Sequence, residues 1–155
     1  MIDAEEASEP AQSTIREEWS LTNTLAACVN VATAAIADAC MDCIDLLTVG
    51  TAAYIRQSDG QASLVLDPSI ADSEPIVSLC AVGFLQSRDE VIFLWTKDDG
   101  NSRSEGLQGR PDFGKLVGNA IEAAKAVHLV VTDALKISAE LSMPGLAKTT
   151  ARGPV

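Results

Sequence analysis

Residues 25–55, LAACVNVATAAIADACMDCIDLLTVGTAAYI, contain the change of periodicity that decides the fold. In the first half, apolar positions recur every three or four residues, which is the spacing of one face of an α-helix. In the second half, β-branched and apolar residues follow one another, which is typical of a strand. We therefore predict an amphipathic helix over residues 21–39, with Ser20 as its N-cap, and a strand over residues 44–55. The many alanines of the helix would let it approach a sheet closely.

Two hairpins and a long helix are predicted around and after this unit. Asp67-Pro68 ends a second strand, since proline lacks the amide donor that a ladder needs. Apolar residues at helical spacing predict a helix from about Asp112 to Leu141, and this spacing outweighs the strand-like composition of residues 127–131. The predicted fold class is α+β with two layers: a helix, two β-hairpins and a long C-terminal helix. The predicted strands are residues 44–55, 64–66, 76–85 and 91–96.

A chain of 155 residues has room for one domain. Residues 1–19 are acidic and poor in aliphatic side chains, so we expect a disordered arm there. The folded unit is expected over residues 20–142, with a glycine-rich mobile loop over 98–111 and a flexible tail over 143–155.

The charge balance excludes several classes of function. The chain has 22 acidic and 11 basic residues, a net charge of −11, so it repels polyanions and anionic membranes. The acidity lies toward the front, because residues 1–100 hold 17 acids and 4 bases. The first residues lack the basic start and apolar run of a secretory signal, and no stretch has about 18 uninterrupted apolar residues. We expect a soluble, intracellular protein that does not bind nucleic acid by itself.

The four cysteines and the single histidine are the first candidates for chemistry. Cys40 and Cys43 form a C-x-x-C pair, but they follow the C-terminus of the predicted helix, where the dipole disfavours a thiolate. A zinc site would also need Cys28, Cys80 or His128, and these are not arranged as a second ligand pair. We interpret the cysteines as reduced packing residues and His128 as a boundary residue on the apolar face of the last helix. No cofactor and no metal is expected.

The carboxylates after the second strand are the other candidates. Asp67, Asp72 and Glu74 could bind a divalent metal through oxygen ligands. The simpler interpretation, which we favour, is that Asp67 starts a turn before Pro68 while the other two are solvated. Phosphate-binding glycine loops and serine hydrolase motifs are absent from the sequence.

Three segments in order carry a resemblance to a known family: Leu25–Ala39, then Ile44–Gly50, then Leu64–Pro68. Together they resemble the second half of the RNase PH-like subunits of the eukaryotic RNA exosome. Residues 89–95, DEVIFLW, with Asp98-Asp99-Gly100 are most similar to the fungal subunits of the mRNA-transport-regulator type, and the ribosomal-RNA-processing subunits are the close alternative.

The resemblance implies a fold and a role. Subunits of this family form a hetero-hexameric ring through which RNA is threaded, in the nucleus, the nucleolus and the cytoplasm. Bacterial and archaeal relatives cleave RNA from its 3′ end with inorganic phosphate, whereas most eukaryotic ring subunits are described as structural. The implied function is a non-catalytic ring subunit that supports 3′-to-5′ RNA processing, including rRNA processing, and RNA degradation, including mRNA decay. Its implied partners are the other RNase PH-like subunits, with RNA contacted indirectly and no membrane.

The sequence departs from the catalytic pattern at specific positions. Catalytic relatives have two aspartates six positions apart. Asp67 matches the first of these, and Ser73 occupies the second. The phosphate-binding arginines come from the family's first half, which has no counterpart before Leu21, and the first hundred residues offer only a few cations. These are Arg16, Arg56, Arg88 and Lys97. We therefore expect no catalytic site and no enzyme activity.

Three hypotheses follow. The first is the structural ring subunit, and the second is a phosphate-dependent 3′-to-5′ exoribonuclease of the RNase PH type. The third is a small thiol protein that uses Cys40 and Cys43. We further expect that the chain is a truncated form of a longer subunit. A half-domain should expose apolar surface and unpaired strand edges that its other half would cover. Where the family has a glycine after the helix, this chain has Cys40, so it must turn there with a side chain present.

Overall fold

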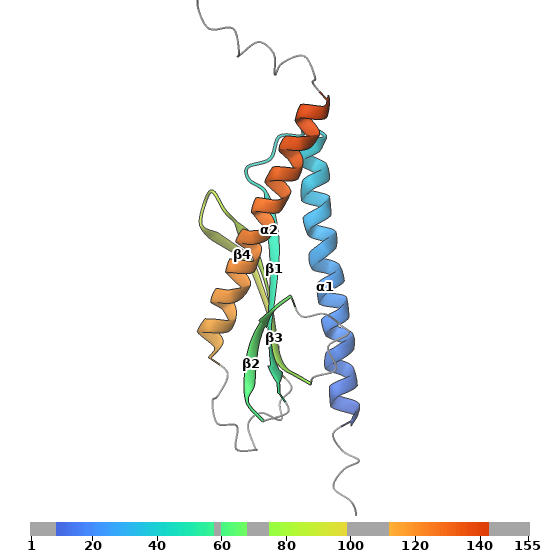
Figure 1. Cartoon of the computed structure of the whole chain (residues 1–155), viewed down its shortest axis with the longest axis vertical. Helices are drawn as coiled ribbons and strands as arrows, with labels where there is room; N and C mark the ends of the chain where they lie inside the picture. The colour runs from blue at the N-terminus through green and yellow to red at the C-terminus, as the bar shows by residue number, and fades with distance from the viewer. Residues whose placement is uncertain (1–8, 58–59, 68–74, 99–111, 143–155) are drawn as a thin grey trace, which may run out of the picture.

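The computed structural model describes residues 9–57, 60–67, 75–98 and 112–142, and side chains from residue 17 onward. Two 30-residue helices enclose the four strands in sequence order (Figure 1). The elements are α1 (Glu9–Asp38), β1 (Leu47–Arg56), β2 (Ala62–Leu66), β3 (Ile76–Leu85), β4 (Glu90–Asp98) and α2 (Phe113–Ser142). The predicted α+β fold of a helix, two hairpins and a long C-terminal helix is confirmed.

The strands form one antiparallel sheet in the order β2-β1-β3-β4. β1 pairs with β2, and β3 pairs with β4, as the two predicted hairpins. β1 also pairs with β3 along nearly its whole length, from Leu47↔Leu85 to Ile55↔Ile76. The two long central strands are therefore buried, whereas β2 and β4 are edge strands.

Helix α2 packs on the sheet through small residues. Leu116, Ala120 and Ala124 are its buried side chains. They lie over Gly50 of β1, where an added Cβ would come within 2.2 Å of the Ala120 carbonyl oxygen and of the Ala124 amide nitrogen. Only a glycine lets the helix backbone come this close to the strand. The buried Thr48 hydroxyl donates a hydrogen bond to the Ala124 carbonyl at 3.0 Å, which adds a polar contact to the same junction.

Helix α1 begins twelve residues earlier than the predicted start at residue 21. The expectation of a disordered arm over residues 1–19 is wrong for residues 9–19, and Ser20 lies inside the helix rather than at its N-cap. The physical reason is Trp19, which is 1% exposed and packs with Ala53 and Leu79 of the sheet. Burial of one tryptophan outweighs the polar composition around it. Residues 1–8, 98–111 and 143–155 of the predicted arm, loop and tail lie outside the described residues, apart from Asp98.

The C-terminus of α1 ends with Cys40 in a left-handed conformation, at a φ of 54°. The Cys40 amide donates to the Ala37 carbonyl, and the Met41 amide donates to the Ile36 carbonyl. This pair of hydrogen bonds is a Schellman motif, in which glycine is the usual residue at the left-handed position. The prediction that the chain turns here with a side chain present is confirmed.

β1 begins three residues later than predicted. Ile44 is 83% exposed and lies in the connection from α1, and the strand starts at Leu47. The Leu46 amide is bound by the Asp45 carboxylate at 2.8 Å, so it does not join the ladder. The predicted long helix with its strand-like segment at residues 127–131 is confirmed, since α2 runs through that segment without interruption.

The described surface is rich in exposed apolar side chains. On α1, Leu21, Leu25, Val31 and Ile36 are 43–68% exposed. By length and composition alone, the segment Glu17–Asp38 is apolar enough to cross a membrane, and little of it is buried. The contacts of Trp19 with the sheet are those of a helix packed on its own domain. The expectation that a half-domain exposes apolar surface is met in the described residues.

Candidate functional site

Asp67 stands where the chain leaves β2, in a left-handed conformation with a φ of 43°. Its amide donates a hydrogen bond to the Thr51 carbonyl at 3.2 Å, and the Thr51 hydroxyl donates to the Asp67 carboxylate at 3.4 Å. The side chain is exposed. These contacts are those of an aspartate that fixes a turn after a strand, as the favoured interpretation of Asp67 predicts. Asp72, Ser73 and Glu74 lie outside the described residues.

The described cations of residues 1–100 either contact other carboxylates or lie away from Asp67. Lys97 binds the Glu18 carboxylate at 3.0 Å, and Arg88 lies 3.7 Å from Glu90. Arg56 pairs with Ala62 at the opposite end of the β1–β2 hairpin from Asp67. Within the described residues, Asp67 forms no ion pair with these cations. The side chain of Arg16 lies outside the described residues.

A small cavity of about 170 Å³, lined by both apolar and polar side chains, borders Asp67. Its walls come from α1, β1 and α2, and the Oδ1 atom of Asn23 is buried there without a hydrogen-bond partner. The polar side chains that line it are Asn23, Asn30, Thr51 and Asp67. Amide, hydroxyl and carboxylate groups can bind water or a neutral polar group, whereas an anionic phosphate would need positive donors. Among the described lining residues none is cationic.

Asn30 ties α1 to the edge of β1. Its side-chain nitrogen donates to the Val49 carbonyl at 3.0 Å, and its side-chain oxygen accepts from the Val49 amide at 2.7 Å. β2 pairs with β1 only from Ala52 onward, so Val49 lies beyond the end of β2. The amide of Asn30 therefore takes the place of a neighbouring strand and satisfies both backbone groups of a buried residue.

The thiols and the histidine occupy separate places. Cys28, Cys40 and Cys43 are free and exposed, and Cys80 is free and buried in the sheet. Burial raises the pKa of the Cys80 thiol to about 11, so this thiol stays protonated at neutral pH. His128 lies partly exposed on α2. Among the described residues, no group of three or more His, Cys, Asp or Glu side chains comes together that could hold a metal ion.

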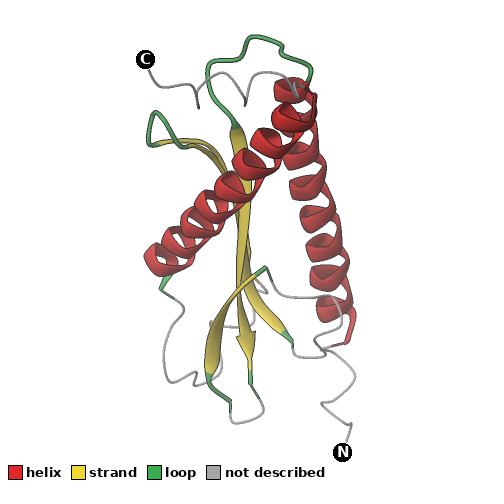
Figure 2. Cartoon of the chain, turned by 45° about the horizontal axis from the view of Figure 1, so that its top comes forward, coloured by secondary structure: helices red, strands yellow, loops and turns green. Residues whose placement is uncertain are grey.

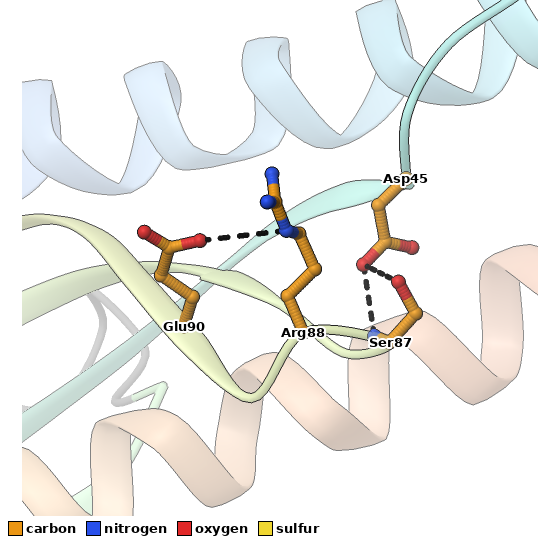
Figure 3. Close-up of polar contacts among 4 residues, drawn as sticks. All are labelled: Asp45, Ser87, Arg88 and Glu90. Atoms are coloured by element: carbon orange, nitrogen blue, oxygen red, sulfur yellow. Dashed lines mark hydrogen bonds and ion pairs between the residues drawn. The ribbon is translucent and has the colours of Figure 1, made fainter.

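A second polar contact links the α1–β1 connection to the β3–β4 turn (Figure 3). The Asp45 carboxylate accepts hydrogen bonds from the Ser87 amide at 2.8 Å and from the Ser87 hydroxyl at 2.7 Å. Partial burial by itself raises the pKa of Asp45. The hydrogen bonds from Ser87 and Leu46 outweigh this effect, with a smaller contribution from the charge of His128, so the pKa of Asp45 lies below its usual value. The ionised carboxylate thus stabilises this end of the sheet.

An apolar groove of about 490 Å³ lies between α1 and the β3–β4 side of the sheet. Leu21, Leu25 and Val29 form its helical wall, and Phe93 and Trp95 of β4 lie on the sheet side. Glu18 lies at the groove, where it binds Lys97. A groove of this composition suits an apolar segment of a protein rather than a charged small substrate.

Sequence reasoning missed Trp19, Asn30 and Asp45 as structural residues. Each acts on a partner far along the chain, and no local pattern marks such a partner. A tryptophan in an otherwise acidic segment was the one available signal, since a large aromatic side chain rarely stays in solvent.

Comparison with known proteins gives one informative similarity. The chain is 34% identical over 135 residues to a protein described as "Exosome complex component MTR3" from Chaetomium thermophilum. The aligned part is 87% of this chain and 46% of that protein, so the chain spans about half the length of the relative. No protein-family profile matches the chain. The resemblance to RNase PH-like exosome subunits of the mRNA-transport-regulator type is confirmed by this sequence relationship.

Proposed function

We propose that the chain, which is similar in sequence to an MTR3 exosome component, is a non-catalytic structural subunit of the exosome core ring. The observation that carries the proposal is the 34% identity over 87% of the chain. In this role the chain supports 3′-to-5′ RNA processing and degradation, including rRNA processing and mRNA decay, while catalysis takes place in other parts of the assembly.

The exposed apolar surface supports a role in assembly. A domain that acts alone rarely leaves a groove of about 490 Å³ lined by leucine, phenylalanine and tryptophan open to solvent. The partners that we propose are the other RNase PH-like subunits of a hetero-hexameric ring. With a net charge of −11, the chain would contact RNA only indirectly, within the assembled channel.

The remaining assignments belong to the same proposal. The functional unit covers residues 20–142, and the helical residues 9–19 extend it at the N-terminal side. The protein works in the nucleus, the nucleolus and the cytoplasm, in a fungal type of exosome. The absence of a catalytic site rests on Ser73 at the second aspartate position and on the few cations of the front half.

The phosphorolytic exoribonuclease is the second candidate, because Asp67 keeps the first aspartate position of the catalytic relatives. Phosphorolysis brings a phosphate dianion beside a phosphodiester, so an active site must supply cationic donors. We expect that the purified chain releases no nucleoside diphosphates from a 3′ single-stranded RNA with phosphate and Mg²⁺. Phosphate-dependent release that is lost in Asp67→Ala would establish the enzyme instead.

The experiment that tests the structural role is affinity purification at physiological salt. A tagged chain, expressed in its own cells, should recover other RNase PH-like exosome subunits, which mass spectrometry identifies. The matched control is a chain with Leu25→Glu and Phe93→Glu, which places two charges in the apolar groove and should lower the recovery. Failure of the unmodified chain to recover any of these subunits would contradict the proposal.

A further inference from the structure

β4 is an edge strand with apolar side chains on both faces. Five consecutive residues, Val91–Trp95, are 37–50% exposed. The described structure pairs β4 with β3 alone, and β4 is the last strand of the sheet. Folded proteins usually protect such an edge with charge, proline or a covering element, because it is a template for another strand.

The register shows which backbone groups of the sheet point to which side. On β1, Val49 binds Asn30 and Thr51 binds the amide of Asp67, both on the side away from β3. The direction of the backbone amide and carbonyl groups alternates along a strand. Those of Gly50 and Ala52, which alternate with Val49 and Thr51, therefore point toward β3.

The same alternation passes through β3 to β4. Gly50 and Ala52 pair with Val82 and Cys80, so the backbone groups of the intervening Ala81 point toward β4. Ala81 pairs with Trp95. The amide and carbonyl groups of Trp95 therefore face β3, and those of its neighbours Leu94 and Thr96 face outward, beyond the sheet.

The groove described above lies beside this edge. Phe93 and Trp95 project from β4 on the side of α1 and line the groove together with Leu21 and Leu25. A strand added to the outer edge would place alternate side chains on the same face of the sheet as Phe93 and Trp95. The edge and the groove thus offer backbone hydrogen bonds and an apolar surface to one extended segment.

The charge around this surface specifies the partner. Two cations, Arg88 and Lys97, already contact the carboxylates of Glu90 and Glu18. Further carboxylates of the same hairpin leave the surroundings negative, and the whole chain carries −11. A second copy would bring the same negative charge to the interface, whereas a segment with basic ends is attracted. The acids of this region are Glu18, Asp89, Glu90 and Asp98.

We propose that the outer edge of β4 binds an extended strand of a different protein chain, an apolar segment flanked by basic residues. The strand adds to the sheet through the backbone groups of Leu94 and Thr96, and its apolar side chains on the α1 side cover Phe93 and Trp95. This deepens the proposed function, since a ring neighbour would supply the strand, but the binding chemistry is testable without any exosome subunit.

The probe is a fluorescein-labelled nine-residue peptide of alternating valine and threonine with lysine at both ends, matched to the nine residues of β4. Fluorescence polarisation with the full chain measures its binding. The control peptide has glutamate at both ends. We expect at least tenfold tighter binding of the lysine peptide at low salt, and a smaller difference at high salt because the charges are screened.

Two variants of the chain identify the binding surface. Thr96→Pro removes an outward amide without removing a bond to β3, and Thr96→Val, which keeps the amide, is its matched control. Leu25→Gln changes an exposed position of the groove on α1 and leaves the strand intact. We expect Thr96→Pro to weaken binding at least tenfold, Leu25→Gln several-fold, and Thr96→Val little. Far-ultraviolet circular dichroism checks that each variant is folded.

Other outcomes overturn the proposal. If both peptides bound equally well, this edge would not be the binding site. The same conclusion would follow if neither Thr96→Pro nor Leu25→Gln changed the binding of the lysine peptide. A dimer of the chain in light scattering that Thr96→Pro abolishes would assign the edge to a second copy. Recovery of exosome subunits by a chain that fails the peptide test would leave the proposed function in place and refute the strand addition alone.

Discussion

Replacing Gly50 with alanine tests how closely α2 packs on the sheet. The added Cβ would lie 2.2 Å from the Ala120 carbonyl oxygen and 2.2 Å from the Ala124 amide nitrogen. Ordinary van der Waals contact begins at 3.4 Å, so α2 has to move away by about 1 Å. Both atoms belong to the helix backbone, and a change of side-chain rotamer cannot relieve the overlap.

The expected cost follows from what α2 would lose. Overpacking of a core typically costs about 1 to 3 kcal/mol. The same movement would stretch the hydrogen bond from the Thr48 hydroxyl to the Ala124 carbonyl, which contributes about 1 kcal/mol. Gly50→Ala should therefore lower the free energy of unfolding by about 3 kcal/mol, a large part of the roughly 5 to 15 kcal/mol that is usual for a domain.

The assay is urea unfolding at low micromolar concentration, followed by far-ultraviolet circular dichroism, because Trp19 and Trp95 would both contribute to a fluorescence signal. Gly118 of α2 provides the matched control, because a Cβ there meets nothing within 4 Å. Gly118→Ala should raise the stability by about 0.5 to 1 kcal/mol through helix propensity. If Gly50→Ala changed the stability by less than about 1 kcal/mol, the close approach of α2 to β1, and with it the described packing, would be refuted.

Four further predictions concern single positions. Asn30→Ala should cost about 2 kcal/mol in urea unfolding, since both hydrogen bonds to Val49 are lost, and Asn30→Asp at least as much, because its second carboxylate oxygen would face the Val49 carbonyl oxygen; a much smaller cost of Asn30→Asp than of Asn30→Ala would contradict the paired geometry. Cys40→Gly should raise the melting temperature, with a gain of up to about 1 kcal/mol, because the left-handed conformation strains a side chain; destabilisation would refute the strain. Asp45→Asn should lower the free energy of unfolding by about 1 kcal/mol at pH 6. Because the folded-state pKa of Asp45 is lowered, the difference in stability between this variant and the wild type should shrink as the pH falls below about 4. A difference in stability that does not depend on pH would contradict the charged contact. Ser73→Asp should not produce phosphorolysis of RNA, because the cationic donors are still missing, and nucleoside diphosphate release by this variant would refute that reason.

The strands and α2 could be predicted because their signals are local. β3 was predicted with the bounds that it has, Ile76–Leu85, since a β-branched run ends at polar turn residues. α2 was predicted through residues 127–131, since the apolar spacing on both sides of this segment fits one helix face. The burial of β1 and β3 along most of their length agrees with the apolar, β-branched composition from which these strands were predicted.

The N-terminal part of α1 could not be predicted from composition. The acidic segment before residue 20 is polar enough for a disordered arm, and what orders its last turns is the contact of Trp19 with Ala53 and Leu79. Those residues lie more than thirty positions away in the sequence. The same holds for Asn30 and Asp45, whose partners are brought to them only by the folded sheet.

The two helices meet at their C-terminal ends (Figures 1 and 2), where the Ser138 hydroxyl donates to the Asp38 carboxylate at 2.7 Å. No sequence pattern connects these residues, which are 100 positions apart. The exposed apolar residues in the C-terminal half of α2 are a second surface that an assembly could cover: Leu129, Val130, Ile137 and Leu141. A groove, an open strand edge and a pair of exposed helix ends are together what a subunit with several neighbours requires.

Native mass spectrometry of the complex that a tagged chain recovers tests whether this chain is a structural subunit of the exosome ring. We expect an assembly that contains one copy of this 16.2 kDa chain together with other RNase PH-like exosome subunits. A chain that is recovered alone, as a homo-oligomer or without any exosome subunit would contradict the claim that it is a structural member of the ring.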